Sequence, residues 1–319
     1  MHPQLGSTED QRDQLMVSRA AVDIRALIFV SVLCAAGVMI WRHSLLHTAR
    51  IALKVDAYTH ILLVLPVSLL LLLSVRRRQP WRPAPAIRLG LSLLSLSMLV
   101  ATGASGLRST AGAAVDLHLS FEMLAFVIWL VGSFVLCFGK AIARICIFPL
   151  LFLLWLVPLP DAALNYIIHF LQEGTTSCAY AMLTAVGVPA IKNGTTLSIP
   201  GLTLQIVEEC SSIRSSMMLI VSSMVMSYLL LRSYWARGIA VLAALPLAIL
   251  KNGLRVLTLA LLGAYVNPEI LDSPLHRQGG PLFLAISLLG MFALIWLMAR
   301  AEKRACGVAM LANSLPQTW

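Results

Sequence analysis

The chain has few charged residues for its length. Asp, Glu, Lys and Arg make up only 12% of its 319 residues, whereas hydrophobic residues make up 59%, and the mean hydropathy is +0.86. Soluble domains are about a quarter charged, so this composition excludes a soluble globular protein. The sparse charge also excludes a disordered chain, and the absence of heptads excludes a coiled coil.

Motifs for metals and nucleotides are also missing. The six cysteines show no C-x-x-C pair and no Cys/His ligand spacing, so neither a zinc site nor a disulfide framework is expected. The sequence has no Walker A loop, no G-x-G-x-x-G after a strand and no H-E-x-x-H. We therefore predict no metal and no cofactor. Lys and Arg outnumber Asp and Glu by 24 to 14. In a membrane protein this excess bears on the orientation of the spans rather than on nucleic-acid binding.

What the sequence has instead is a series of long apolar runs. A hydrocarbon core about 30 Å thick needs about 20 apolar residues per helix. The sequence therefore predicts an all-α polytopic membrane protein with about eight transmembrane helices. They run approximately over residues 24–41, 60–75, 87–107, 119–138, 141–159, 211–231, 238–262 and 281–299. The first run has no signal-peptide cleavage site and is interpreted as a retained span.

Basic residues fall mostly on one side of these spans. Fifteen of the 24 lie in the tails and loops that this order places on one face, and membrane proteins keep Lys and Arg inside. We therefore predict a multi-pass protein of the inner membrane with cytoplasmic tails over 1–23 and 301–319. Between the tails lie a five-span region over 24–160 and a three-span region over 210–300. The other nine basic residues are Arg42, Arg50, Lys54, Arg108, Lys192, Arg214, Lys251, Arg255 and Arg277.

The stretch 161–209 is the one long section without a clear span. Its first part has a helical face of apolar residues, which suits a helix lying in the outer interface; these are Leu164, Ile167, Ile168 and Leu171. Residues 179–188 are too short to cross alone. Alternating residues around Pro200-Gly201 predict two short strands and a tight turn before Cys210. If 162–188 spans instead, everything downstream inverts and Cys210 faces the cytoplasm.

Cys210 directly precedes a predicted span, at its outer end. Unpaired N–H groups and the positive end of the helix dipole favour a thiolate there. Arg214 lies one turn further on the same face and acts in the same sense, whereas Glu208 and Glu209 act in the opposite sense. The alternative is a buried structural cysteine, the usual state of a free thiol in an apolar chain.

Lys251, Asn252 and Arg255 interrupt the span 238–262. A charged group inside a span costs about 2.5 to 3.5 kcal/mol, so such a residue marks a functional site or extends its side chain to the interface. Arg255 is about 26 Å along a helix that starts inside at Gly238, which brings it to the outer leaflet. We expect Lys251 to face lipid.

His276 lies in the loop before the last span, on the same predicted outer side. A lone loop histidine is usually only solvated. Here, however, a thiol, a guanidinium and an imidazole from three elements converge at one membrane face, and this set suits thiol acyl transfer with a cation for the oxyanion. Tyr58 and His60, before the second span, either line a substrate entrance or anchor the interface.

Taken in order, these motifs resemble those of the exosortase/archaeosortase family of multi-spanning cysteine transpeptidases. Asp56-Ala57-Tyr58-Thr59-His60 resembles the family's D-Y-S-H opening, and Pro158-Leu159-Pro160 its P-x-P. Val207-Glu208-Glu209-Cys210-Ser211-Ser212-Ile213-Arg214-Ser215 is similar to its cysteine motif, although Glu209 and Ser212 stand where the family has Ala and Gly. Asn252-Gly253-Leu254-Arg255-Val256 resembles its N-x-x-R-V motif, and His276 with Pro281-Leu282-Phe283 its histidine motif.

The resemblance implies that Cys210 is the acyl-thioester nucleophile, Arg255 the proton donor and His276 the third group. Arginine is a reluctant acid, so on physical grounds His276 suits proton transfer and Arg255 oxyanion binding. We expect substrate-binding or supporting roles for Arg214, Asn252, His60 and Tyr58. The implied partners are exported proteins with a C-terminal sorting signal, made of a short Pro-Glu-Pro-like motif, an apolar helix and a basic tail.

Two other functions are compatible with a polytopic chain. One is a transporter or a partner subunit of an exopolysaccharide export system, in which Lys251 and Arg255 bind an anionic substrate. Internal repeats would favour it, and the sequence shows none. The other is an acyltransferase acting on a lipid-linked glycan, which would place a His-Asp or His-rich pair at its centre instead of a lone cysteine.

Overall fold

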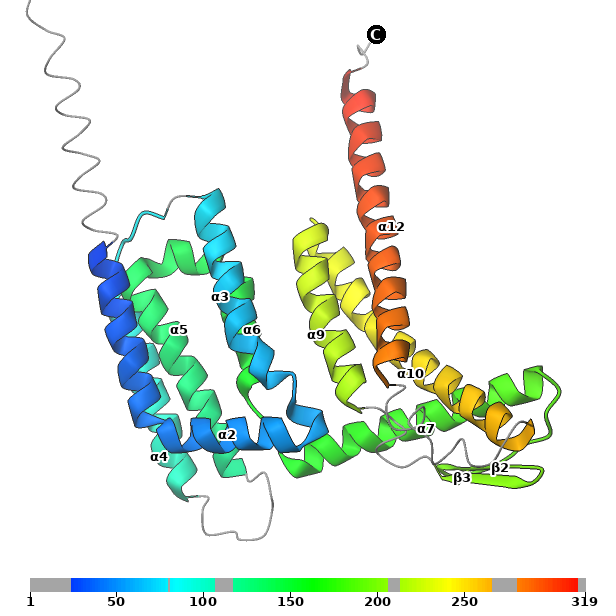
Figure 1. Ribbon diagram of the computed structural model, residues 1–319. Coiled ribbons are helices and arrows are strands. Elements are labelled where there is room, and N and C mark those ends of the chain that lie inside the picture. Colours follow the sequence, from blue (N-terminus) through cyan, green and yellow to red (C-terminus); the bar gives the residue numbers. More distant parts are fainter. Residues whose placement is uncertain (1–23, 80, 107–116, 206–212, 266–279, 315–319) are drawn as a thin grey trace, which may run out of the picture. The chain divides into compact units, whose positions relative to one another are not determined.

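A computed structural model describes residues 24–79, 81–106, 117–205, 213–265 and 280–314 (Figure 1). The described chain is helical apart from one small sheet, and it divides into two compact units after Asp161. Six described helices are long and apolar enough to cross a membrane, or up to eight if each of two bent pairs is one span. The predicted all-α polytopic fold is thus confirmed.

The first unit begins with a helix over Ile24–Ile40, which bends by 76° into the next helix. Figure 1 shows that second helix lying across the ends of its more upright neighbours. The elements are α2 (Arg42–Lys54), η1 (Asp56–Tyr58), α3 (Ile61–Arg78), α4 (Ile87–Gly106), α5 (Leu117–Ile145), α6 (Ile147–Phe152) and η3 (Leu153–Leu156). The predicted spans 60–75 and 87–107 thus correspond to α3 and α4, whereas α2 was not predicted.

The predicted boundary between the fourth and fifth spans falls at a break inside α5. Gly139 has φ 86° there, in the left-handed region that favours glycine. A Cβ at Gly139 would lie 1.9 Å from the carbonyl oxygen of Ala84, and the Ala84 N–H donates to the Phe138 carbonyl at 3.3 Å. The predicted span 141–159 is therefore not one straight helix but a sequence of short pieces through α6 and η3.

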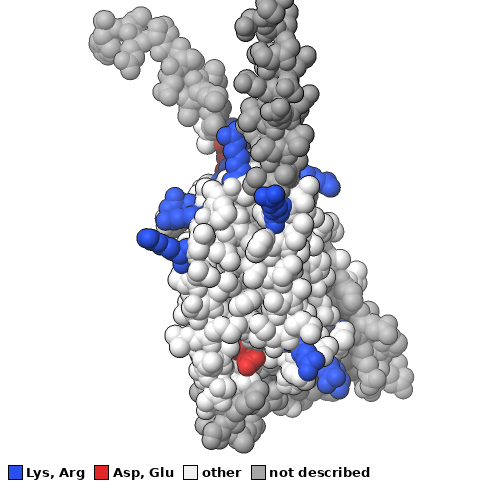
Figure 2. All heavy atoms as spheres, turned by 90° about the vertical axis from the view of Figure 1, so that its left-hand side faces the viewer, with Lys and Arg blue, Asp and Glu red and all other residues white. Residues whose placement is uncertain are grey.

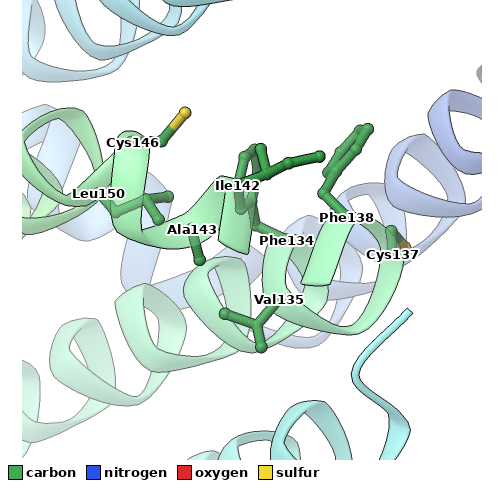
Figure 3. Packing of buried hydrophobic residues seen from close by; sticks show 8 residues of the cluster. All are labelled: Phe134, Val135, Cys137, Phe138, Ile142, Ala143, Cys146 and Leu150. Carbon is green, nitrogen blue, oxygen red and sulfur yellow. The ribbon is translucent and has the colours of Figure 1, made fainter. Parts of the chain in front are cut away.

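A buried cluster surrounds this break (Figure 3). Its side chains come from both sides of Gly139 and are Phe134, Val135, Cys137, Phe138, Ile142, Ala143, Cys146 and Leu150. The ring of Trp81 stands edge-on to Phe134 and Phe138, with centroids 5.6 and 5.0 Å away. The connection before α4 is thus packed against the bend of α5, and these apolar contacts hold the short pieces in place.

The second unit consists of α7 (Asp161–Ala185), β1 (Ile191–Asn193), β2 (Thr196–Ile199), β3 (Leu202–Gln205), α9 (Ile213–Leu230), α10 (Tyr234–Tyr265) and α12 (Gly280–Ser314). The two pieces expected over 161–173 and 179–188 form the single helix α7. By itself α7 is not among the six candidate spans, and it qualifies only together with 147–156, from which it is bent by 97°.

The predicted pair of strands is confirmed, with β1 added as a third antiparallel strand in the order β1-β2-β3. Leu197 and Ile199 of β2 are buried against Leu183 of α7 and Val256 of α10. The expected alternation along the strand therefore reflects one apolar face that packs on two helices.

α9, α10 and α12 pack together through small and apolar side chains, which are Leu219, Leu231, Ala240, Ala244, Ala248, Met291 and Ile295. At the far end of this bundle the carboxylate of Glu302 accepts hydrogen bonds from the backbone N–H groups of Arg232 and Ser233, at 2.9 and 3.1 Å. Glu302 thus satisfies donors just before the first turn of α10 and attaches α12 to it.

Basic residues gather at particular ends of the helices. In the first unit they lie in the last turn of α3, in the first turn of α4 and after the break in α5, and are Arg76, Arg77, Arg78, Arg88, Lys140 and Arg144. Figure 2 shows the side of the molecule that is on the left in Figure 1. Most basic side chains in this view lie at its upper end, and a smaller group lies at its lower end. In the second unit Arg232, Arg237, Lys303 and Arg304 lie beside the Glu302 contact, at the opposite end of α9 from Ile213.

Candidate active site

Cys210 and His276 lie outside the described residues. What the structure describes is the start of α9, three residues after Cys210, and the turn of α10 that carries Arg255. It also describes the motif at η1 and the Pro158-Leu159-Pro160 segment in the first unit.

The polar turn of α10 is buried. Lys251, Asn252 and Arg255 are 5%, 0% and 6% exposed. The expectation that Lys251 faces lipid is therefore wrong, because α9 covers this side of α10. The side chain that does point outward from this turn is Leu254, at 40% exposure.

Two serines of α9 contact this turn. The Lys251 ammonium donates a hydrogen bond to the hydroxyl of Ser215, and the Asn252 amide donates one to the hydroxyl of Ser216 at 3.5 Å. Ser215 ends the cysteine motif and Asn252 begins the arginine motif, so the fold brings these two motifs together. Sequence reasoning missed both serines, although two adjacent buried hydroxyls at the start of an apolar helix were a visible signal.

The antiparallel packing of α9 and α10 determines which residue of α9 lies opposite Arg255. Ser215 and Ser216 pair with Lys251 and Asn252, and α10 runs in the opposite direction to α9. Arg255 lies three residues beyond Asn252, about 4.5 Å further along α10, and Ile213 lies three residues before Ser216. Arg255 therefore comes level with the first residue of α9, Ile213, at the end of the helix nearest Cys210 in the sequence.

The supporting residue Arg214 lies on a different side of α9. Arg214 is exposed, whereas Ile213, Ser215 and Ser216 beside it are buried. The structure thus places Arg214 in the first turn, where it was expected, but away from the contact between the serines and α10.

A third helix fixes the polar turn from another direction. A Cβ at Gly253 would lie 2.7 Å from the Cys178 sulfur and 3.0 Å from its Cβ, and one at Gly174 would lie 2.9 Å from Ile249. α7 and α10 therefore cross in close contact at two glycines. Residues held between packed helices keep their geometry better than residues on loops, which suits an electrostatic role for Arg255.

Tyr58 and His60 are both buried in the first unit, at 3% and 7% exposure. The Tyr58 hydroxyl donates to the Leu159 carbonyl at 2.8 Å. The His60 Nδ1 is 3.0 Å from the Ala57 carbonyl, and its ring stands edge-on to Trp155 with centroids 5.5 Å apart. The Tyr58 contact connects the first motif to the P-x-P segment.

Ser120, which sequence reasoning did not single out, holds the same segment. Its hydroxyl donates to the Pro158 carbonyl at 2.8 Å, so two side-chain donors, Tyr58 and Ser120, bind consecutive carbonyls. Within the described residues no group of three or more His, Cys, Asp or Glu is placed to hold a metal ion.

The family comparison covers the motifs described above. The family model for transmembrane exosortase matches residues 53–293, well over half of the chain. The matched region runs from just before Asp56 to beyond Phe283 and so contains all five motif segments. No curated protein and no solved structure matches. The protein belongs to the transmembrane exosortase family.

Proposed function

We propose that this protein is a membrane-embedded cysteine protease and transpeptidase that cleaves C-terminal sorting signals of exported proteins. The observation that carries the proposal is the pair of hydrogen bonds from Lys251 and Asn252 to Ser215 and Ser216. They hold the start of α9, which lies three residues after Cys210 in the sequence, against the turn that carries Arg255. The helix that follows Cys210 in the sequence and the turn that carries Arg255 are thereby held together.

The proposed reaction is an acyl transfer through a thioester. The Cys210 thiolate attacks the carbonyl carbon of the scissile peptide, and the Arg255 guanidinium stabilises the oxyanion that forms. The C–N bond then breaks, and the leaving amine takes a proton from His276. A second nucleophile, from an envelope or extracellular acceptor or from water, attacks the thioester carbon and gives its proton back to His276, and the C–S bond breaks to regenerate the thiolate.

The burial of Arg255 supports its role as oxyanion donor. A guanidinium enclosed by packed helices offers a fixed fork of N–H donors and needs no reorganisation when charge develops. Proton donation, the role that the family resemblance implies for it, would require a group that gives up a proton readily. We therefore assign the proton to His276.

The proposed side of the reaction is extracytoplasmic. Arg232, Arg237, Lys303 and Arg304 lie at the end of the second unit opposite to the start of α9. Basic ends of spans face the cytoplasm, so the start of α9 and Cys210 face outward. A sorting signal whose apolar helix lies in the bilayer would then present its short motif at the level of Cys210.

The burial of the two cations argues against the transporter alternative. An anion path would need Lys251 and Arg255 to line an accessible cavity, yet both are 6% exposed or less. Lys251 is moreover already bound to Ser215 of α9.

A substitution of the nucleophile tests the proposal. We expect Cys210→Ser to accumulate full-length substrate in membranes. The matched control is Cys178→Ser, because Cys178 is the cysteine in contact with Gly253 beside Arg255 and should be dispensable. Processing by Cys210→Ser at the wild-type rate would refute the thioester mechanism.

A further inference from the structure

The helix α2 has the geometry of a segment that lies on the membrane surface. The helix that precedes it, Ile24–Ile40, is about 26 Å long, close to the roughly 30 Å thickness of the hydrocarbon core. The chain then turns by 76° into α2, which lies across the neighbouring helix ends in Figure 1. α2 therefore begins where the first span reaches the interface and continues along it.

The surface of α2 is divided into three faces. One face, with Thr48 and Ala52, is buried against the first unit. A second face exposes the apolar side chains of Leu46 and Leu53, at 56% and 72%. The third face is a stripe of four exposed nitrogen-bearing side chains at spacings of four, three and four residues, namely His43, His47, Arg50 and Lys54.

This stripe occupies a narrow arc. At 3.6 residues per turn the four positions fall within about 60° of the helix circumference, and Leu46 and Leu53 are centred about 80° away. When the two leucines enter the acyl chains, the stripe therefore lies at the level of the lipid head groups. Within the described chain none of the four stripe residues makes a hydrogen bond or ion pair.

We propose that α2 binds the phosphate head groups of anionic lipids through this stripe, which we call the basic stripe. Charge complementarity carries the choice of partner, since Arg and Lys on an interfacial helix with apolar neighbours are attracted to anionic lipid. A soluble polyanion would fit a basic face turned fully to water, whereas here two exposed leucines hold the helix in the bilayer. The proposal is independent of the chemistry assigned to Cys210.

The position of α2 gives this binding a structural consequence. Two residues after Lys54 the chain enters η1, where Tyr58 binds the Leu159 carbonyl. Head groups bound to the stripe thus fix the depth of the first family motif in the membrane.

The experiment uses the full chain in phosphatidylcholine vesicles that contain a photoactivatable phosphatidylglycerol, or the same fraction of photoactivatable phosphatidylcholine. After illumination, mass spectrometry maps crosslinks to residues 42–54. We expect at least about fivefold more crosslinking of α2 by the phosphatidylglycerol probe, and a loss of this excess at high salt. Equal crosslinking by the two lipids in the wild-type chain would overturn the proposal without any variant.

Two variants make the assignment specific. In the stripe variant, His43→Gln, His47→Gln, Arg50→Gln and Lys54→Gln together should remove the excess. In the matched control, Arg76→Gln, Arg77→Gln and Arg78→Gln remove three charges at the other end of the first unit and should leave α2 crosslinking unchanged. Stripe-dependent binding of dextran sulfate to the detergent-solubilised protein, with no preference for phosphatidylglycerol, would assign the stripe to a soluble polyanion and contradict the proposal.

Discussion

The Tyr58 hydroxyl donates a 2.8 Å hydrogen bond to the carbonyl oxygen of Leu159, a residue 101 positions away in the sequence. This bond closes the first unit, because Tyr58 precedes its helix α3 and Leu159 lies just before the division at Asp161. Two family motifs, D-A-Y-T-H and P-L-P, are thus joined by one contact. Both are conspicuous in the sequence, but only the fold shows that one binds the other.

Tyr58→Phe should destabilise the first unit. The ring remains in place, but the carbonyl of Leu159 loses its donor in a part-buried contact, and the net loss of a hydrogen bond costs about 0.5 to 1.5 kcal/mol. Thermal unfolding of the detergent-solubilised protein measures the effect. The matched control is Tyr166→Phe, because Tyr166 is 75% exposed. This variant should unfold at the same temperature as the wild type. An unchanged unfolding temperature for Tyr58→Phe would mean that water replaces the hydroxyl.

Lys251 and Ser215 should act as a pair. Because the ammonium is buried and bound to the serine hydroxyl, Lys251→Ala is expected to impair processing strongly, in contrast to the mild effect expected for a lipid-facing residue. Lys251→Met and Ser215→Ala should each slow substrate cleavage at matched membrane abundance, and the double variant should be no slower than the worse single variant. Additive effects would show that the two residues act separately.

The contribution of Arg255 to the cleavage rate should depend on the geometry of its side chain as well as on its charge. Lysine is a point charge on a flexible stem and cannot reproduce the guanidinium fork, and a preorganised oxyanion donor is worth about 10² to 10³ in rate. Arg255→Lys should therefore cleave substrate about a hundredfold more slowly while inserting normally. The control is Arg214→Lys, at an exposed position of α9, which should be much milder. Wild-type cleavage by Arg255→Lys would show that the oxyanion donor is misassigned.

Gly253→Ala should disrupt the crossing of α7 and α10. The new Cβ would lie 2.7 Å from the Cys178 sulfur, and overpacking of this kind costs about 1 to 3 kcal/mol. Replacing the sulfur as well, with Cys178→Ala, should restore part of the loss in unfolding temperature. Gly238→Ala is the control in the same helix, because a Cβ there meets nothing within 4 Å. A Gly253→Ala variant as stable as Gly238→Ala would mean that the helices separate at little cost.

The start of α9 should be accessible from outside the cell. A membrane-impermeant maleimide added to intact spheroplasts should label the wild-type chain, and Cys210→Ser should remove that label. Cys178→Ser, at a half-buried position packed against α10, should not change it. Labelling that requires permeabilised membranes would reverse the proposed orientation.

The sequence by itself determined several of the long helices and the places where they end. Apolar runs of about 20 residues predicted α3, α4 and α9 within a few positions, and alternation around Pro200-Gly201 predicted β2 and β3. These properties are local, because hydropathy and side-chain period are read along one segment. The boundary at Gly139 was visible for the same reason, since a glycine followed by a basic residue interrupts an apolar run.

The tertiary structure decided which side of each helix is covered. α2 was not predicted, because its exposed leucines, basic stripe and buried face divide a short segment into three parts and leave no single apolar run. Lys251 was assigned to lipid because a sequence window gives the same average whichever neighbour packs beside it. Burial of Lys251 follows from the serines of α9, 36 positions away, and contacts between distant segments exist only once the helices have packed together.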